Sequence, residues 1–155
     1  METNEKLNEV LNDLIRINHD RVEGYEKAIK ELSANDIDLK ALFKRYAGES
    51  RGFANTLMAQ VSANGGNPDP ATTISGKIYR VWMEVRTAMS NKERESVLSS
   101  CEFGEDAAQR AYIQALEADV KMPAGIRDII AGQKMSLKSA HDEVKHYRDL
   151  EAAEK

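Results

Sequence analysis

Glu105 is the most conspicuous chemical group of the sequence, because it stands on an apolar helix face. The stretch from Val97 to Leu116 has the periodicity of one long helix at about 100° per residue. Glu105 and Tyr112 fall on the same side as its apolar residues. A carboxylate that faces a protein core is costly unless an opposite charge or hydrogen bonds accompany it. The sequence therefore predicts a polar site at Glu105, and its partners must come from other helices.

Four long helices are expected to position that site. Apolar residues recur every three or four positions over 3–33, 37–63, 90–121 and 123–152. Short polar breaks separate the first two helices and the last two, so each pair forms an antiparallel hairpin. Asn64 to Pro70 is rich in glycine and proline, and a short amphipathic helix over 73–89 is expected after it. The fold class is therefore all-α, a four-helix bundle with residues 1–155 as one domain.

The connection between the second and third long helices suggests the topology. It has about 25 residues, enough to run the length of the bundle, which favours parallel second and third helices. This is the one-crossover arrangement of ferritin-like bundles. Simple up-down-up-down order, with the short helix as a lid, is the alternative. With the crossover, we expect both hairpin turns at one end, so that residues counted from each turn share a depth.

This count predicts two polar layers in the bundle. The first contains Asn18, Glu49, Glu105 and His141. Inward Glu and His side chains on facing helices build metal sites in bundles, and these donors suit Fe, Mn or Zn. The second layer contains Tyr25, Tyr46, Tyr112 and Gln133, which could orient the ligands. Three further candidates, for which a surface role is favoured, are His19, Glu26 and Glu102.

A metal-free network is an equally plausible interpretation of the same residues. Glu49 and Glu105 would then hydrogen-bond to His141 and to the tyrosines, and the network would fix helix register. In either case Glu105 should lie within reach of Glu49 or His141. Two carboxylates at close range repel, so a metal ion, a proton or the imidazolium of His141 must lie between them.

Composition excludes several classes of function. The net charge of −4 and the lack of a Lys/Arg run argue against nucleic-acid binding. No apolar run approaches a membrane span of about 20 residues, and the N-terminal residues lack a signal-peptide layout, so a cytoplasmic location is expected. The single cysteine, Cys101, is expected as a buried inert thiol. No nucleophile motif is present, so an enzyme is not favoured. A homodimer through a long helix face is plausible.

Four segments carry a family resemblance: 18–29, 42–57, 99–116 and 136–150. They resemble an uncharacterised bacterial family of ferritin-like four-helix bundles, a domain of unknown function related to ferritins and rubrerythrins. The resemblance implies a ferritin-like fold. The di-iron ligand pattern is incomplete, since Gly52 follows Glu49 by three residues and Lys138 precedes His141 by three. Glu105 matches the third-helix glutamate, whereas the first helix offers Asn18.

Three hypotheses for function follow. The first is a metal-associated bundle in stress response or metal handling, with one ion bound through Glu49, Glu105 and His141. The second is a non-catalytic structural or interaction protein whose polar core only sets packing. The third, a di-metal oxidase, is weakened by the incomplete ligand set. Metal content of the purified protein separates them, as one, no or two equivalents respectively.

Overall fold

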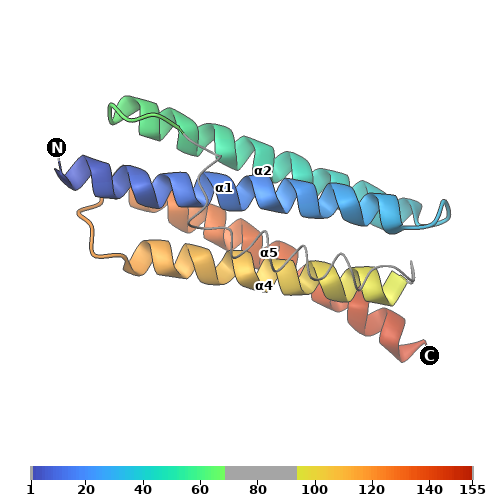
Figure 1. The fold of residues 1–155 in the computed structure, drawn as a ribbon. Coiled ribbons are helices and arrows are strands. Elements are labelled where there is room, and N and C mark those ends of the chain that lie inside the picture. Colours follow the sequence, from blue (N-terminus) through green and yellow to red (C-terminus); the bar gives the residue numbers. More distant parts are fainter. Residues whose placement is uncertain (1, 69–93, 155) are drawn as a thin grey trace.

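Four long α-helices make up the described structure (Figure 1). The computed structural model describes residues 2–68 and 94–154. The helices are α1 (Glu2–Glu31), α2 (Ile37–Ala63), α4 (Arg94–Glu117) and α5 (Ala124–Ala153). The predicted all-α four-helix bundle is confirmed. The short helix expected over 73–89, and the expected start of the third long helix at 90–93, lie outside the described residues.

The predicted helix ends agree with the structure except at the end of α4. α2 spans Ile37–Ala63 as predicted, and it stops where Gly65 adopts a φ of 80°, the left-handed conformation that glycine favours. α4 stops at Glu117, four residues before the predicted end at residue 121. Asp119 and Val120 are weaker helix formers than the residues before them, and Val120 packs against the core from the loop.

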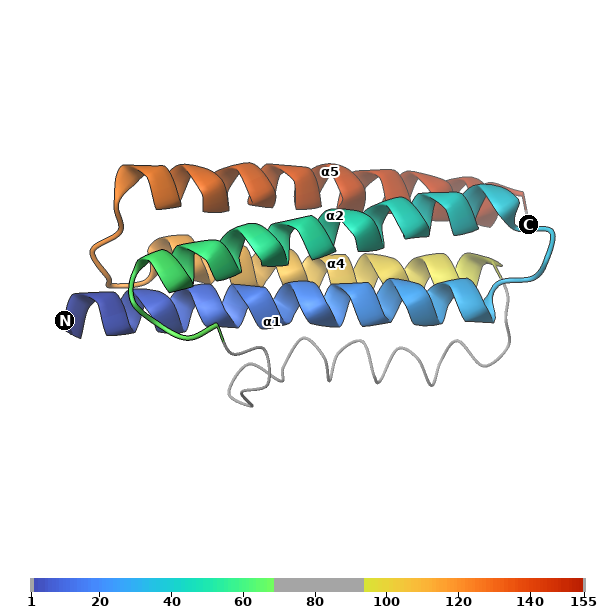
Figure 2. The same cartoon turned by 90° about the horizontal axis from the view of Figure 1, so that it is seen from above.

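Each helix packs against two neighbours. α1 contacts α2 and α4, and α5 contacts α4 and α2. α2 and α4 run in the same direction (Figure 2), so the parallel arrangement expected from the crossover length is confirmed. The side chains between the helices form one cluster of buried residues, among them Leu11, Leu14, Phe43, Leu57 and Val97. Within the described residues, no helix combines the length and apolarity required to cross a membrane.

The expected position of the two hairpin turns is wrong. The α1–α2 turn and the α4–α5 turn lie at opposite ends of the bundle (Figure 1). A hairpin reverses the chain, so two hairpins whose inner helices are parallel must turn at opposite ends. Residues counted from both turns therefore do not share a depth, and the predicted layers must be replaced by those that the structure shows.

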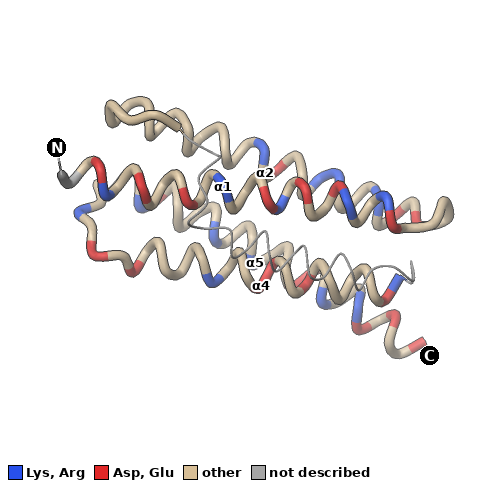
Figure 3. Tube along the Cα trace, viewed as in Figure 1, with Lys and Arg blue, Asp and Glu red and all other residues tan. Residues whose placement is uncertain are grey.

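Charged residues of both signs are interleaved along α1, α4 and α5, as Figure 3 shows. The second half of α2, from Gly52 to Ala63, carries no charged residue. The charged residues of α2, among them Arg45, Glu49 and Arg51, therefore all lie in its first half. That half of the helix also contains the residues that contact Arg21 of α1.

Candidate functional site

Glu105 lies in the core, as the sequence predicts, with no exposed surface. Its partner is Arg21, which is also fully buried. Arg21 Nε donates to Glu105 Oε1 at 2.8 Å, and Arg21 Nη2 donates to Glu105 Oε2 at 2.9 Å. Tyr25 Oη donates to Glu105 Oε2 at 2.7 Å. Glu105 is therefore a fully bonded carboxylate, held by a fork of two parallel hydrogen bonds from one guanidinium.

Arg21 joins Glu105 on α4 to α2. Its Nη1 donates to Ser50 Oγ at 2.7 Å and to Glu49 Oε1 at 3.0 Å. Burial by itself would lower the pKa of Arg21, but the charge of Glu105 raises that pKa above its usual value. Burial raises the pKa of Glu49. We call Arg21, Tyr25, Glu49, Ser50 and Glu105 the core network.

The positive group predicted beside Glu105 is thus the guanidinium of Arg21. A metal ion, a proton and the imidazolium of His141 were the groups predicted from the sequence for this place, and Arg21 was not among them. The guanidinium also lies 5.3 Å from the ring centre of Tyr25 and 5.4 Å from that of Tyr46, within range for cation–π attraction. Arg21 therefore reaches the core with its charge compensated on several sides.

The three tyrosines predicted to be buried are buried. Tyr25 and Tyr112 are fully buried and Tyr46 is 3% exposed. Tyr46 Oη donates to Glu143 of α5. Burial is the main cause that raises the pKa of all three phenols. Each hydroxyl is hydrogen-bonded, as expected, and stays protonated at neutral pH.

A second polar cross-connection links all four helices. Asn18 Nδ2 of α1 donates to Tyr112 Oη of α4 at 2.8 Å, and Tyr112 Oη donates to Gln133 Oε1 of α5 at 2.6 Å. Gln133 Nε2 then donates to the backbone carbonyl of Phe53 on α2 at 3.4 Å. The layer predicted from Tyr25, Tyr46, Tyr112 and Gln133 is thereby corrected. Tyr112 bonds to Asn18 and to Gln133, whereas Tyr25 bonds to Glu105 and Tyr46 to Glu143.

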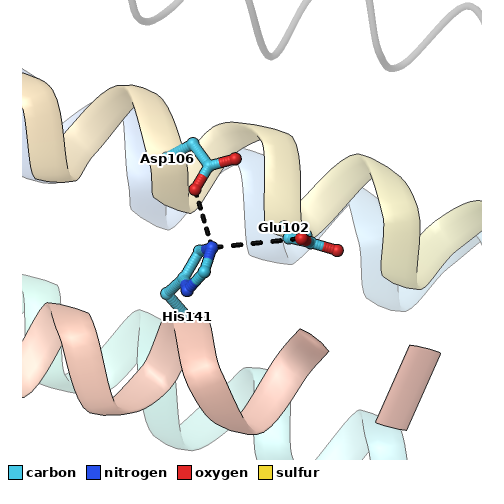
Figure 4. Close-up of side chains that lie close together, drawn as sticks. All are labelled: Glu102, Asp106 and His141. Atoms are coloured by element: carbon cyan, nitrogen blue, oxygen red, sulfur yellow. Dashed lines mark ion pairs between the residues drawn. The ribbon is translucent and has the colours of Figure 1, made fainter. Parts of the chain in front are cut away.

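The structure does not gather Glu49, Glu105 and His141 into one group. Among the described residues, the His, Cys, Asp and Glu side chains close enough to hold a metal ion together are Glu102, Asp106 and His141 (Figure 4). One ligand atom from each lies within 4.8 Å of the others. We call these three residues the α4–α5 cluster. His141 and Glu102 are among the candidates predicted from the sequence, whereas Asp106 is not.

The α4–α5 cluster has two carboxylates on one helix and an imidazole on the next. Glu102 and Asp106 are four residues apart on α4 and so share a face. His141 Nε2 of α5 lies 2.6 Å from Asp106 Oδ1 and 4.0 Å from Glu102 Oε2. The Glu102 side chain is 13% exposed, against 45% for Asp106. The cluster therefore lies at the margin of the core, partly open to solvent.

A second layer of charges surrounds the α4–α5 cluster. His141 Nδ1 lies 3.1 Å from Asp142 Oδ1, a carboxylate oxygen that accepts from Nδ1 when this nitrogen carries a proton, and Nε2 faces α4. Hydrogen bonds from Lys138 and then from His141 lower the pKa of Asp142. On the far side, Arg148 Nη1 lies 2.7 Å from Glu102 Oε1. Two carboxylates near the imidazole thus have cationic partners of their own, Lys138 for Asp142 and Arg148 for Glu102.

The remaining candidates lie apart from these groups. Glu26 is exposed and accepts a hydrogen bond from Arg51 at 2.9 Å, so its favoured surface position is confirmed. His19 is half-buried on α1. Cys101 is fully buried, and burial followed by the nearby charge of Glu105 raises its pKa, which favours the inert thiol expected from the sequence.

Comparison with protein families identifies a match for most of the chain. A family model described as a domain of unknown function (DUF2383) covers residues 6–118 of the chain. The match includes the core network and two members of the α4–α5 cluster, and it stops before α5, so His141 lies beyond it. No curated protein matches the chain significantly.

Proposed function

The chain belongs to the DUF2383 family, and we propose that it binds one divalent transition-metal ion through Glu102, Asp106 and His141. The observation that supports this most is the convergence of three ligand atoms from two helices within 4.8 Å. His141 is oriented for this role, because its Nδ1 lies next to the Asp142 carboxylate and its Nε2 points toward α4. In metal-binding histidines, the N–H of the ring nitrogen that does not bind the metal commonly donates a hydrogen bond to a carboxylate.

The spacing of the three ligand atoms suits an ion after a small adjustment. Ligand atoms around a tetrahedral ion with bonds of about 2.1 Å lie about 3.4 Å apart. The distances from His141 Nε2 to Asp106 Oδ1 and to Glu102 Oε2 are 2.6 Å and 4.0 Å, one below and one above that value. Asp106 is the most exposed of the three, so its side chain can make most of the adjustment.

The donor set indicates the class of ion. Two carboxylate oxygens and one imidazole nitrogen, with no thiolate, suit Mn, Fe or Zn. Of these three, Zn²⁺ should bind most tightly, because Mn²⁺ and Fe²⁺ stand at the low end of the usual order of divalent-ion affinities. Three protein ligands leave at least one coordination position open for water or another ligand. Metal handling is the role that this arrangement supports, and it agrees with a ferritin-like relationship of the bundle.

Metal titration tests the proposal directly. Protein freed of metal by chelation and dialysis is titrated with Zn²⁺ and with Mn²⁺ by calorimetry, and the bound metal is counted by elemental analysis. Wild type should bind one equivalent, and H141Q and D106N should bind none. E49Q is the matched control, because it removes a carboxylate of the core network and should keep one equivalent. No binding by wild type, or loss of binding in E49Q alone, would refute the proposal.

For the core network we infer a packing role, the second function considered from the sequence. The observation that favours it is that Arg21 neutralises Glu105 with two hydrogen bonds inside the core. A metal ion at Glu105 would have to displace this guanidinium, whereas His141 already contacts other carboxylates. The predicted homodimer and a role in stress response stay predictions.

A further inference from the structure

One polar pattern occurs twice on α5, seven residues apart. The residues Lys138, His141 and Asp142 recur as Lys145, Arg148 and Asp149. In both copies the lysine pairs with the aspartate four residues later, at 2.9 Å and 3.3 Å. In both copies the aspartate also accepts a hydrogen bond from the residue before it. Seven residues are about two turns, so His141 and Arg148 lie on the same side of α5, and both lie near Glu102 of α4.

Glu102 of α4 lies between the two copies. Its Oε2 is the oxygen nearer to His141 Nε2, at 4.0 Å, and its Oε1 lies 2.7 Å from Arg148 Nη1. Glu95 precedes Glu102 by seven residues and therefore follows the same face of α4. The hydrogen bond to Asp149 raises the pKa of Arg148, and the charges of Glu102 and Glu95 raise it further. Arg148 thus has the same kind of surroundings as His141, with acidic residues from both helices.

We propose that Arg148 is the resident cation of a second slot, at Oε1 of Glu102, and that it limits the protein to one metal ion. This inference rests on the proposed function. A carboxylate that bridges two ions needs both oxygens, and Arg148 holds Oε1 of Glu102. A guanidinium does not lose its proton in proteins and has no lone pair to offer a metal. Arg148 therefore withholds from a second ion both Oε1 of Glu102 and a ligand atom at position 148.

The R148H variant tests this inference by adding a ligand in place of the resident cation. Zn²⁺ bound per chain is counted by calorimetry and by native mass spectrometry. We expect one ion in wild type, two in R148H, and one in the double variant R148H/H141Q, where only the second slot remains. The matched control is R51H, because Arg51 is an exposed arginine that pairs with Glu26 on another face of the bundle. R51H should bind one ion.

The outcomes separate the two proposals. Two ions in wild type would show that Arg148 does not limit binding, and one ion in R148H would show that replacing Arg148 opens no second slot; either result overturns the inference. If wild type binds none and R148H binds one, the proposed function fails and the second slot stands. If neither protein binds Zn²⁺, both proposals fail. Far-UV circular dichroism of each variant confirms that the half-exposed position 148 tolerates the change.

Discussion

Glu49 and Glu105 both accept hydrogen bonds from Arg21, and we predict that neutralising them has very different effects on stability. Glu105 has no exposed surface and receives three hydrogen bonds, two from Arg21 and one from Tyr25. Glu49 receives one from Arg21, and 30% of its side chain is exposed. E105Q leaves a buried guanidinium with one half-exposed counter-charge, whereas E49Q leaves the buried pair complete.

The magnitudes follow from burial. Removing one partner of a buried ion pair costs about 3–5 kcal/mol, because the other charge stays buried without compensation. The new amide of E105Q also directs N–H groups toward the donors of Arg21, which places the expected loss within that range. For E49Q we expect a loss of about 0–1 kcal/mol. Burial raises the pKa of Glu49, so its ionised form costs free energy in the folded state and the neutral amide removes that cost.

Equilibrium unfolding in urea, followed by far-UV circular dichroism, measures both changes. A double-mutant cycle with R21M adds a second check, because residues in direct contact are coupled by about 0.5–3 kcal/mol. R21M/E105Q should lose less stability than the sum of the single variants. A loss below about 1 kcal/mol in E105Q, equal losses in E105Q and E49Q, or full additivity would refute the assignment of Arg21 and Glu105 as a coupled buried pair.

Three further predictions concern stability. Y112F should lose about 1–2 kcal/mol in urea unfolding, because Gln133 Oε1 is left without its donor; an unchanged midpoint would contradict this bond. R94Q should lose roughly 1 kcal/mol at pH 7. The hydrogen bond from Arg94 lowers the pKa of Asp38 to about 2, so the stability it supplies is present above the usual aspartate pKa and lost as the pH falls toward 2. The Tm difference between wild type and R94Q should therefore shrink in acid, and a constant difference would be evidence against the pairing. G132A should gain about 0.5–1 kcal/mol, because a Cβ at this exposed helical glycine meets nothing within 4 Å; a destabilised protein would contradict it.

The helices and the buried positions could be predicted from the sequence, because both depend on the periodicity of apolar residues. The apolar spacing predicted α2 to the residue and placed Glu105 and Tyr112 on a buried face, where the structure has them. The connection length predicted the parallel arrangement of α2 and α4. These features are local, or follow from one length, and need no knowledge of which side chain faces which.

The contacts between side chains of different helices could not be predicted in the same way. Arg21 flanks its apolar stripe, and a long side chain with a terminal charge is normally expected to extend to solvent. Its reach into the core is visible only when α4 brings Glu105 opposite it. Asp106 was missed because it follows Glu105 by 100° around the helix, off the buried face. One pattern could have pointed to it, because Glu102 and Asp106 are four residues apart and share a face of α4.

The arrangement of the hairpins has a consequence for the order of folding. Both partners of Glu105, Arg21 and Tyr25, belong to the α1–α2 hairpin, whereas Glu105 belongs to the α4–α5 hairpin. Contacts within a hairpin are close in sequence and form fast, but the buried ion pair can form only when the hairpins dock and both charges lose their water. E105Q should therefore accelerate unfolding more than it slows refolding. Docking of the two hairpins around this pair is then a late step, which completes the core after the helices have formed.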